Sequence, residues 1–399
     1  MTWRPRPACS TRSSPAPSRA HRAGEQGPHP DPFDRPSSPS VRTLGDMSEV
    51  YAARRARLHD QCTAAGSAAA LVSRPANVRY LCGAVPPGAV LLLGPVQDVL
   101  VAAEVPSAPP LSPHLSSGPT RSEEPRLLVL PGADGDPAVA AADLAAADGA
   151  DSLAVEEHDL TVARHRALGT AAPRVRLADL DRAVEQLRLV KDDEEISCMR
   201  IAGELADQAL GELLESILVG RTERHLALEL ERRLVDHGAD GPAFPTVVAA
   251  GPNAGRPGHL PTDRRVEEGD FLTICLGADY RGYRCQVGRT FVIGPSPADW
   301  QVELYDAVFA AQRAGREALL PGRAYCDVDR VTRQVLTAAG YGDALEPCTG
   351  HGVGLEIDED PRLTPSAMGK LDACVPVTVE PGVHLPGRGG VRIDDTLVV

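Results

Sequence analysis

The stretch GHGVGLE at residues 350–356 places one histidine among three glycines. Because glycine has no β-carbon, the backbone on both sides of His351 can approach a bound group closely. The pattern therefore favours a role for His351 in a functional site over a purely structural role in a glycine-rich turn. Residues 375–380 and 391–398, which follow this stretch, have the apolar pattern of β-strands.

Around this stretch, the second half of the chain has helical and strand patterns in separate blocks. The apolar spacing predicts helices over residues 194–218, 223–237, 301–320 and 325–339, and further strands over 244–250 and 271–276. Since these helices are segregated from the strands, residues 181–399 are predicted to form an α+β domain.

The first half has a different organisation. Strands are predicted at residues 68–73, 78–82, 89–93, 126–130 and 153–156, with helices at 54–65 and 138–147 and a Pro/Ser-rich loop over 107–124. Alternation of strands and helices predicts an α/β domain over residues 47–180. Residues 1–46 are rich in Arg, Pro and Ser without apolar periodicity, so they are predicted to be a disordered tail or the product of a mis-assigned start before Met47.

Composition excludes several classes of function. The 399 residues suggest two or three domains, and 41 basic against 55 acidic residues give a net charge of −14, which disfavours nucleic acid or a membrane surface as partner. The nine cysteines contain no C-x-x-C pair, and residues 1–46 hold no apolar run typical of a secretory signal. We therefore expect a cytoplasmic protein.

Five stretches, taken in order, carry a family resemblance: residues 187–195, 244–254, 269–291, 350–356 and 379–396. Together they resemble the pita-bread metallopeptidases, in the Xaa-Pro aminopeptidase and prolidase branch, and residues 70–81 resemble the creatinase-type N-terminal domain that precedes it. The resemblance implies an α/β creatinase-like domain followed by an α+β pita-bread domain of two pseudo-symmetric halves. It also implies a dinuclear metal centre that cleaves an N-terminal residue before proline, and a homodimer.

The family's five ligands, Asp, Asp, His, Glu and Glu, fall here on Cys275, Gln286, His351, Glu380 and Asp394. Two divalent ions bring four positive charges, and only two of these side chains are carboxylates, so two adjacent ions would repel strongly. For Cys275, the role of a small buried apolar residue is favoured over that of a metal ligand or nucleophile. We therefore expect a broken dinuclear site, in a pseudo-peptidase or weak peptidase that binds peptide N-termini or Xaa-Pro peptides.

Two enzymatic alternatives remain open. His351, Glu380 and Asp394 could hold one divalent ion (Zn, Mn, Co or Fe) and hydrolyse Xaa-Pro bonds, with Glu380 or Asp358 as the base. Glu380 and His351 are the candidate catalytic residues in either case. The fold also supports metal-free creatinase-like hydrolysis, although Gly258 stands where that chemistry has a histidine.

Three further side chains are candidates for substrate binding: His259, Asp358 and His384. For His259, the role of an exposed loop histidine is favoured over that of a shifted catalytic group. His384 fits a pocket-lining and a packing role equally well. Asp358 stands where the family has a second histidine, so it either adds negative charge near the pocket or faces solvent. Arg392 and Asp395 are expected to pair and hold the last strand in place.

Overall fold

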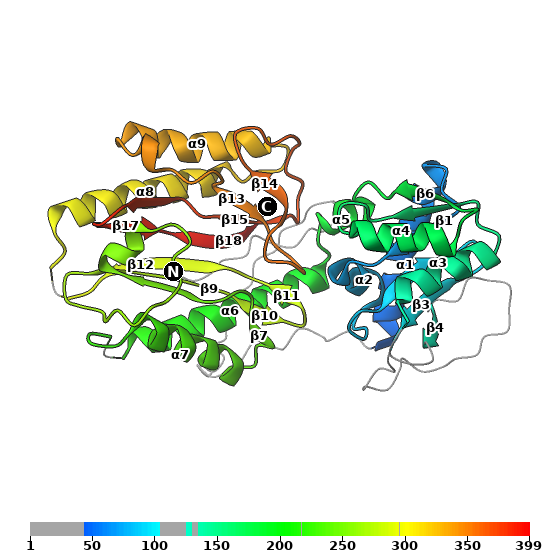
Figure 1. Ribbon diagram of the computed structural model, residues 1–399. Coiled ribbons are helices and arrows are strands. Elements are labelled where there is room, and N and C mark those ends of the chain that lie inside the picture. The colour runs from blue at the N-terminus through cyan, green and yellow to red at the C-terminus, as the bar shows by residue number, and fades with distance from the viewer. Residues whose placement is uncertain (1–43, 104–124, 130–134, 217, 295) are drawn as a thin grey trace, which may run out of the picture. The chain divides into compact units, whose positions relative to one another are not determined.

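The computed structural model describes residues 44–103, 125–129, 135–216, 218–294 and 296–399 (Figure 1). Helix α1 begins at Leu44, so three residues of the predicted 1–46 tail are helical, and the rest of that tail lies outside the described residues, as does the predicted 107–124 loop. The elements of the first half are α1 (Leu44–Ala64), β1 (Ala69–Val72), α2 (Pro75–Cys82), β2 (Val90–Leu93), β3 (Asp98–Ala102), β4 (Arg126–Val129), α3 (Pro137–Ala147), β5 (Ser152–Val155), α4 (Val162–Ala171), β6 (Arg176–Asp179) and α5 (Ala183–Arg188).

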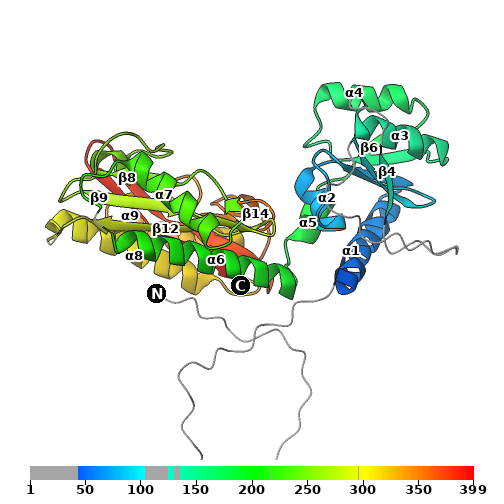
Figure 2. The same cartoon turned by 90° about the horizontal axis from the view of Figure 1, so that it is seen from below.

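The first half is a three-layer α/β/α arrangement, as the alternating pattern predicts. Its six-stranded sheet has the order β4-β3-β2-β1-β5-β6, with β1 parallel to β5 and antiparallel to β2. Alternate residues of β1 point to opposite faces, so Leu71 packs with α3 and α4 while Ala70 and Val72 pack with α1 and α2. Figure 2 shows α3 and α4 on one side of this sheet and α1, α2 and α5 on the other.

The predicted strand at residues 78–82 is wrong, because this segment belongs to helix α2. Pro75 occupies the first turn, where its fixed φ suits a helix and its missing N–H costs nothing. Asn77 and Leu81, four residues apart, are both buried, as are Val78 and Cys82. This four-residue spacing outweighs the β-propensity of valine and tyrosine in the segment.

The second half consists of two helix pairs and an antiparallel sheet. Its elements are α6 (Asp193–Leu214), α7 (Glu223–Asp236), β7 (Gly241–Pro242), β8 (Val247–Ala250), the 3₁₀ turn η1 (Gly251–Gly255), β9 (Phe271–Leu276), β10 (Ala278–Tyr280), β11 (Tyr283–Arg284), β12 (Val287–Val292), α8 (Asp299–Ala318), α9 (Tyr325–Ala338), η2 (Gly342–Ala344), β13 (Gly350–Gly352), β14 (Glu359–Leu363), β15 (Pro376–Val379), β16 (Gly382–Leu385), β17 (Gly389–Arg392) and β18 (Asp394–Val398).

A seven-stranded sheet of order β14-β13-β15-β18-β12-β9-β8 forms the centre of this half. Figure 1 shows α6 and α7 on one side of the sheet and α8 and α9 on the other. Along β9, Leu272, Ile274 and Leu276 pack against α6 and α7, whereas Phe271 packs with α8 on the opposite face. The odd-numbered residues of β9, Cys275 included, therefore face away from α6 and α7.

Candidate functional site

The sheet brings five predicted positions together, because the strands that carry them are consecutive. His351 lies on β13, Glu380 follows β15, Asp394 opens β18, Gln286 precedes β12 and Cys275 lies on β9. These strands have the order β13-β15-β18-β12-β9 in the sheet. Positions far apart in the sequence are thus neighbours across one sheet.

Gly288 on β12 lies between two of these positions, on the neighbouring strands β18 and β9. Asp394 pairs with Gly288, and Gly288 pairs with Cys275 on β9. A β-carbon at Gly288 would lie 2.6 Å from Cβ of Asp394 and 3.1 Å from Sγ of Cys275. Only glycine fits here, because its absent side chain leaves the space that the carboxylate and the thiol occupy.

The amide of Gln286 is bound to both predicted carboxylate ligands. Its Nε2 donates to Oε2 of Glu380 at 2.7 Å and also to Oδ2 of Asp394. Each bond removes a lone pair that a metal ion would need. Gln286 itself is held by Thr396, whose hydroxyl oxygen accepts from the Gln286 backbone N–H at 2.9 Å.

Arg392 brings a cation to the same two carboxylates. Its Nη2 lies 2.6 Å from Oε2 of Glu380 and 3.4 Å from Oδ2 of Asp394, and its Nη1 lies 3.5 Å from Oε2 of Glu346. The expected pairing of Arg392 with Asp395 is wrong. Adjacent residues of an extended chain point to opposite faces, so Asp394 is on the side of Arg392 and Asp395 is not.

Asp395 instead supports the far side of the last strand. Its carboxylate contacts Nη2 of Arg289 at 2.7 Å and accepts from Nε2 of Gln312 at 2.6 Å. Arg289 also donates to the backbone carbonyl of Asp394 at 2.7 Å. These contacts fix the strand from behind and leave the opposite face to the site.

His351 carries a positive charge near neutral pH. Its Nδ1 lies 3.0 Å from the carbonyl oxygen of Gly352, and its Nε2 lies 3.6 Å from Oε2 of Glu380. Burial disfavours the imidazolium, but the contact with Glu380 and the Glu380 charge outweigh burial and raise the pKa of His351 to about 9. A protonated imidazole has no free lone pair for a metal.

The two carboxylates differ in protonation. Burial pushes the pKa of Glu380 up, but the charge of Arg392 and the contacts with His351 leave it below its ordinary value. Asp394 is fully buried, and burial followed by the repulsion of Glu380 raises its pKa to about 7 despite Arg392. Near pH 7 the site therefore has two cations beside one full and one partial negative charge.

These donors do not fit a dinuclear metal centre. Within the described ranges, no group of three or more His, Cys, Asp or Glu side chains is arranged to hold a metal ion. Guanidinium and amide N–H groups occupy one oxygen of each carboxylate, Oε2 of Glu380 and Oδ2 of Asp394, and burial raises the pKa of the Cys275 thiol to about 12, so it is not a thiolate. Gln286 offers no negative charge.

Two polar atoms of the site lack a partner. Oδ1 of Asp394 and Nε of Arg392 are both buried without a hydrogen bond to any residue that the structure describes. One is an acceptor and the other a donor, and buried polar groups are rarely left unpaired. The arrangement can therefore accept one hydrogen bond from a bound group and donate another to it.

The remaining candidates lie at different places. His259 is buried rather than exposed as expected, because its Nε2 lies 2.9 Å from Oε2 of the fully buried Glu223. His384 contacts the carbonyl oxygen of Ala254 at 3.0 Å and, through Nε2, Glu346 at 2.8 Å. Asp358 is exposed, and its Oδ2 lies 3.0 Å from Nη2 of Arg362 on β14.

Sequence reasoning missed Glu346 and Glu223 and assigned Arg392, which also organises this region, the wrong partner. The correct partner could have been found, because Arg392 lies two residues before Asp394 in an extended segment and so shares its face. Glu346 lies in a loop before β13, where no periodicity places its side chain. Glu223 stands in the first turn of α7 and accepts hydrogen bonds from Ala250 and Thr262 as well as contacting His259; only the folded loop reveals this.

Comparison with known proteins agrees with the fold and its two parts. Residues 197–399 match metallopeptidase family M24, and residues 54–190 match the creatinase/prolidase N-terminal domain. The Xaa-Pro dipeptidase of Pyrococcus furiosus is 39% identical over 220 residues, which cover 55% of this chain and 63% of that protein. An uncharacterized peptidase of Bacillus subtilis, YqhT, is 35% identical over 258 residues, covering 65% of this chain and 73% of that protein.

Solved structures show the same likeness over most of the described chain. The Xaa-Pro dipeptidase from Bacillus anthracis superposes with a TM-score of 0.79 at 29% identity, covering 88% of this chain and 95% of that one. The prolidase from Pyrococcus horikoshii superposes with a TM-score of 0.76 at 29% identity, covering 87% and 95%. The predicted creatinase-like domain followed by a pita-bread domain is confirmed. Among the helices that the structure describes, none has the length and apolar character needed to span a bilayer.

Proposed function

Because the chain belongs to metallopeptidase family M24, we propose that it is an Xaa-Pro peptidase-like protein with a broken metal centre, which binds peptide N-termini and hydrolyses them weakly or not at all. Members of the family are metallopeptidases. One observation carries the proposal: Arg392 and Gln286 both contact Glu380 and Asp394, the two carboxylates left among the five ligand positions.

The chemistry of this arrangement favours a peptide terminus over a metal ion. An α-ammonium group can donate to the open Oδ1 of Asp394, and a carbonyl of the same peptide can accept from Nε of Arg392. Divalent ions would have to displace Arg392 from Glu380 and deprotonate His351, whose pKa is about 9. A peptide satisfies the unpaired atoms without breaking the contacts already present.

The rival proposal is a mononuclear hydrolase. His351, Glu380 and Asp394 lie on or directly after the neighbouring strands β13, β15 and β18, and imidazole and carboxylate groups are both ligands of catalytic metal ions, which use three protein ligands. On this proposal Arg392 swings away from the carboxylates when one ion binds. Metal-stimulated cleavage that disappears in Glu380→Gln would favour it.

A binding and turnover experiment separates the two. We expect the purified full chain to bind Ala-Pro by calorimetry and to release no free alanine with Mn²⁺, Co²⁺ or Zn²⁺ present. N-acetylated Ala-Pro should bind at least about 10-fold more weakly, since it lacks the ammonium group. Asp394→Asn should weaken Ala-Pro binding, while Asp327→Asn, a half-buried residue of α9 outside the site, should not. Rapid metal-dependent release of alanine, or equal binding of the acetylated peptide, contradicts the proposal.

We also propose a cytoplasmic location and a homodimer. Seven cysteines within the described ranges, namely Cys62, Cys82, Cys198, Cys275, Cys285, Cys326 and Cys348, are free thiols, which suits a reducing compartment. Sedimentation equilibrium of the full chain tests the dimer, and a mass of one chain at micromolar concentration would contradict it.

A further inference from the structure

The segment 353–358 connects β13, which carries His351, to β14, and it is held by residues of the first half. Leu355 is 7% exposed and belongs to an apolar cluster whose other buried members come from the first half of the chain. Among them are Leu58, Tyr80 and Val184 of α1, α2 and α5. The segment that leaves the His351 strand thus contributes one side chain to the core beneath the α/β sheet.

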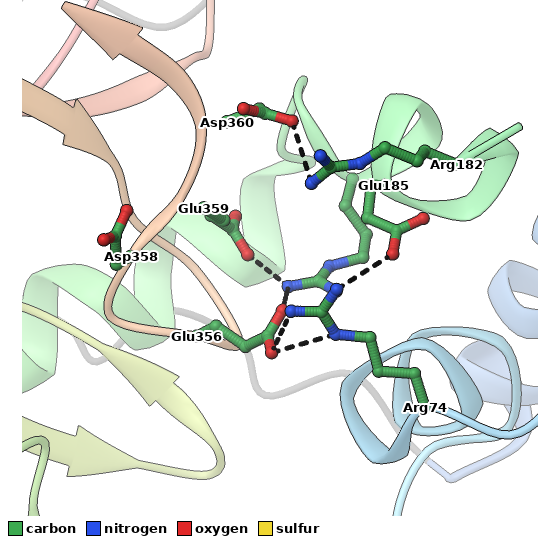
Figure 3. A pocket seen from close by; sticks show the side chains of 8 residues that line it. Arg74, Arg182, Glu185, Glu356, Asp358, Glu359 and Asp360 are labelled. Carbon is green, nitrogen blue, oxygen red and sulfur yellow. Dashed lines mark hydrogen bonds and ion pairs between the residues drawn. The ribbon is translucent and has the colours of Figure 1, made fainter. Parts of the chain in front are cut away.

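Beside Leu355, Arg188 of α5 contacts two acidic residues, Glu356 within the segment and Glu359 directly after it. Its Nη2 lies 2.9 Å from Oε2 of Glu356 and also contacts Oε2 of Glu359 (Figure 3). Lys191 contacts the other oxygen of Glu359 at 2.5 Å. Arg188 and Lys191 are 3% and 4% exposed, so these charges are paired out of water and little screened.

The network continues into α2. Arg74, directly before this helix, donates to Oε1 of Glu356 from Nη2 at 2.8 Å and from Nε at 3.1 Å. Nη1 of Arg188 donates to Oδ1 of the fully buried Asn77 at 2.6 Å. Figure 3 shows the side chain of Arg74 reaching Glu356.

The backbone of the segment has little room to shift. A β-carbon at Gly354 would lie 2.3 Å from Oε1 of Glu359 and 2.9 Å from Cε of Lys191. The carbonyl oxygen of Gly354 also accepts from the backbone N–H of Arg284 at 2.8 Å. Ion pairs, close packing and a backbone bond therefore fix the same few residues.

We propose that Arg188 is a positioning residue that, with Arg74 and Lys191, clamps segment 353–358 and thereby sets the conformation of the strand carrying His351. The α/β half then controls the site of the pita-bread half through α5. That Arg188 influences ligand binding rests on the proposed function; that it clamps the segment does not.

Local hydrogen exchange tests the clamp. In Arg188→Ala we expect amide exchange of residues 350–358 to rise by about 100-fold, because Glu356 and Glu359 lose the buried cation that they share and keep only Arg74 and Lys191, respectively. Exchange in β9 and α8 should stay unchanged. Arg188→Lys should recover part of the protection, since it restores the charge but not the fork of two N–H groups. Arg182→Ala is the matched control, because Arg182 pairs with Asp360 at 3.2 Å and both side chains are largely exposed.

The outcomes separate the clamp from general stability and from the proposed function. Loss of protection confined to 350–358 and its partners in α2 and α5 supports the clamp, and Ala-Pro affinity should fall with it. Unchanged exchange in Arg188→Ala, or an equal rise throughout the chain, overturns the clamp. If the unaltered protein binds no Ala-Pro, the proposed function fails while the exchange pattern still decides the clamp.

Discussion

Replacing Arg392 with methionine removes the cation that contacts both carboxylates of the site while keeping an unbranched apolar stem. In the folded protein the Arg392 guanidinium lies 2.6 Å from Glu380 and 3.4 Å from Asp394. After the change at pH 8, both carboxylates are left with the amide of Gln286 and the partly titrated His351. The free energy of unfolding should therefore fall.

The size of the loss follows from burial and protonation. Removing one partner of a buried ion pair costs about 3–5 kcal/mol, and Arg392 is 22% exposed, so we expect about 3 kcal/mol at pH 8. At pH 5 Asp394, whose pKa is about 7, is protonated, and His351, whose pKa is about 9, is charged beside Glu380. The loss should then shrink to about 1 kcal/mol.

Urea unfolding followed by circular dichroism at pH 8 and pH 5 measures both values. The control is Arg313→Met on α8, where the pair with Glu317 leaves both side chains mostly exposed, so the free energy of unfolding should stay almost unchanged. A loss of less than about 1 kcal/mol at pH 8 for Arg392→Met, or an equal loss at both pH values, refutes the reasoning.

Three further substitutions test single features of the site. Asp394→Asn should stabilise the protein, because burial keeps the folded pKa of Asp394 at about 7, above its ordinary 3.8; the gain should grow from pH 4 to pH 7, up to about 4 kcal/mol in urea unfolding. Protonation of His351, whose pKa of about 9 lies above its ordinary 6.5, contributes about 3 kcal/mol to the free energy of unfolding below pH 6.5, and this contribution is lost as the pH rises through about 9. His351→Gln should remove that contribution, which a pH series of urea midpoints will show. Gly288→Ala should cost about 1–3 kcal/mol in thermal unfolding, since its β-carbon would lie 2.6 Å from Cβ of Asp394, whereas Gly203→Ala in α6, with open space around it, should be neutral or stabilising.

Much of the fold could be predicted because long periodic segments identify themselves. Strand β9 (Phe271–Leu276) matches its predicted bounds, and α9 (Tyr325–Ala338) differs from them by one residue. The short segment 78–82 failed because four or five apolar residues fit a strand or a helix turn equally well. Its helical state depends on Pro75 and on burial against the sheet, which local pattern does not reveal.

The site could be predicted as a set of positions but not as a charge arrangement. Family resemblance placed His351, Glu380 and Asp394, and the sheet brings the strands that carry them side by side. The burial of His259 depends on Glu223, which lies 36 residues away in the sequence. The position of Arg392 between two carboxylates required the strand alternation to be worked out, and no local pattern indicated Glu346.

Elemental analysis of the metal content decides whether Glu380 and Asp394 bind a metal ion or Arg392. The full chain is purified from cells grown with added Mn, Co and Zn. We expect far less than one equivalent per chain. The double variant Cys275→Asp, Gln286→Asp should gain metal, because it restores two negative charges and frees Glu380 and Asp394 from the amide of Gln286. About one equivalent in the unaltered chain, lost in Glu380→Ala, would contradict the broken centre.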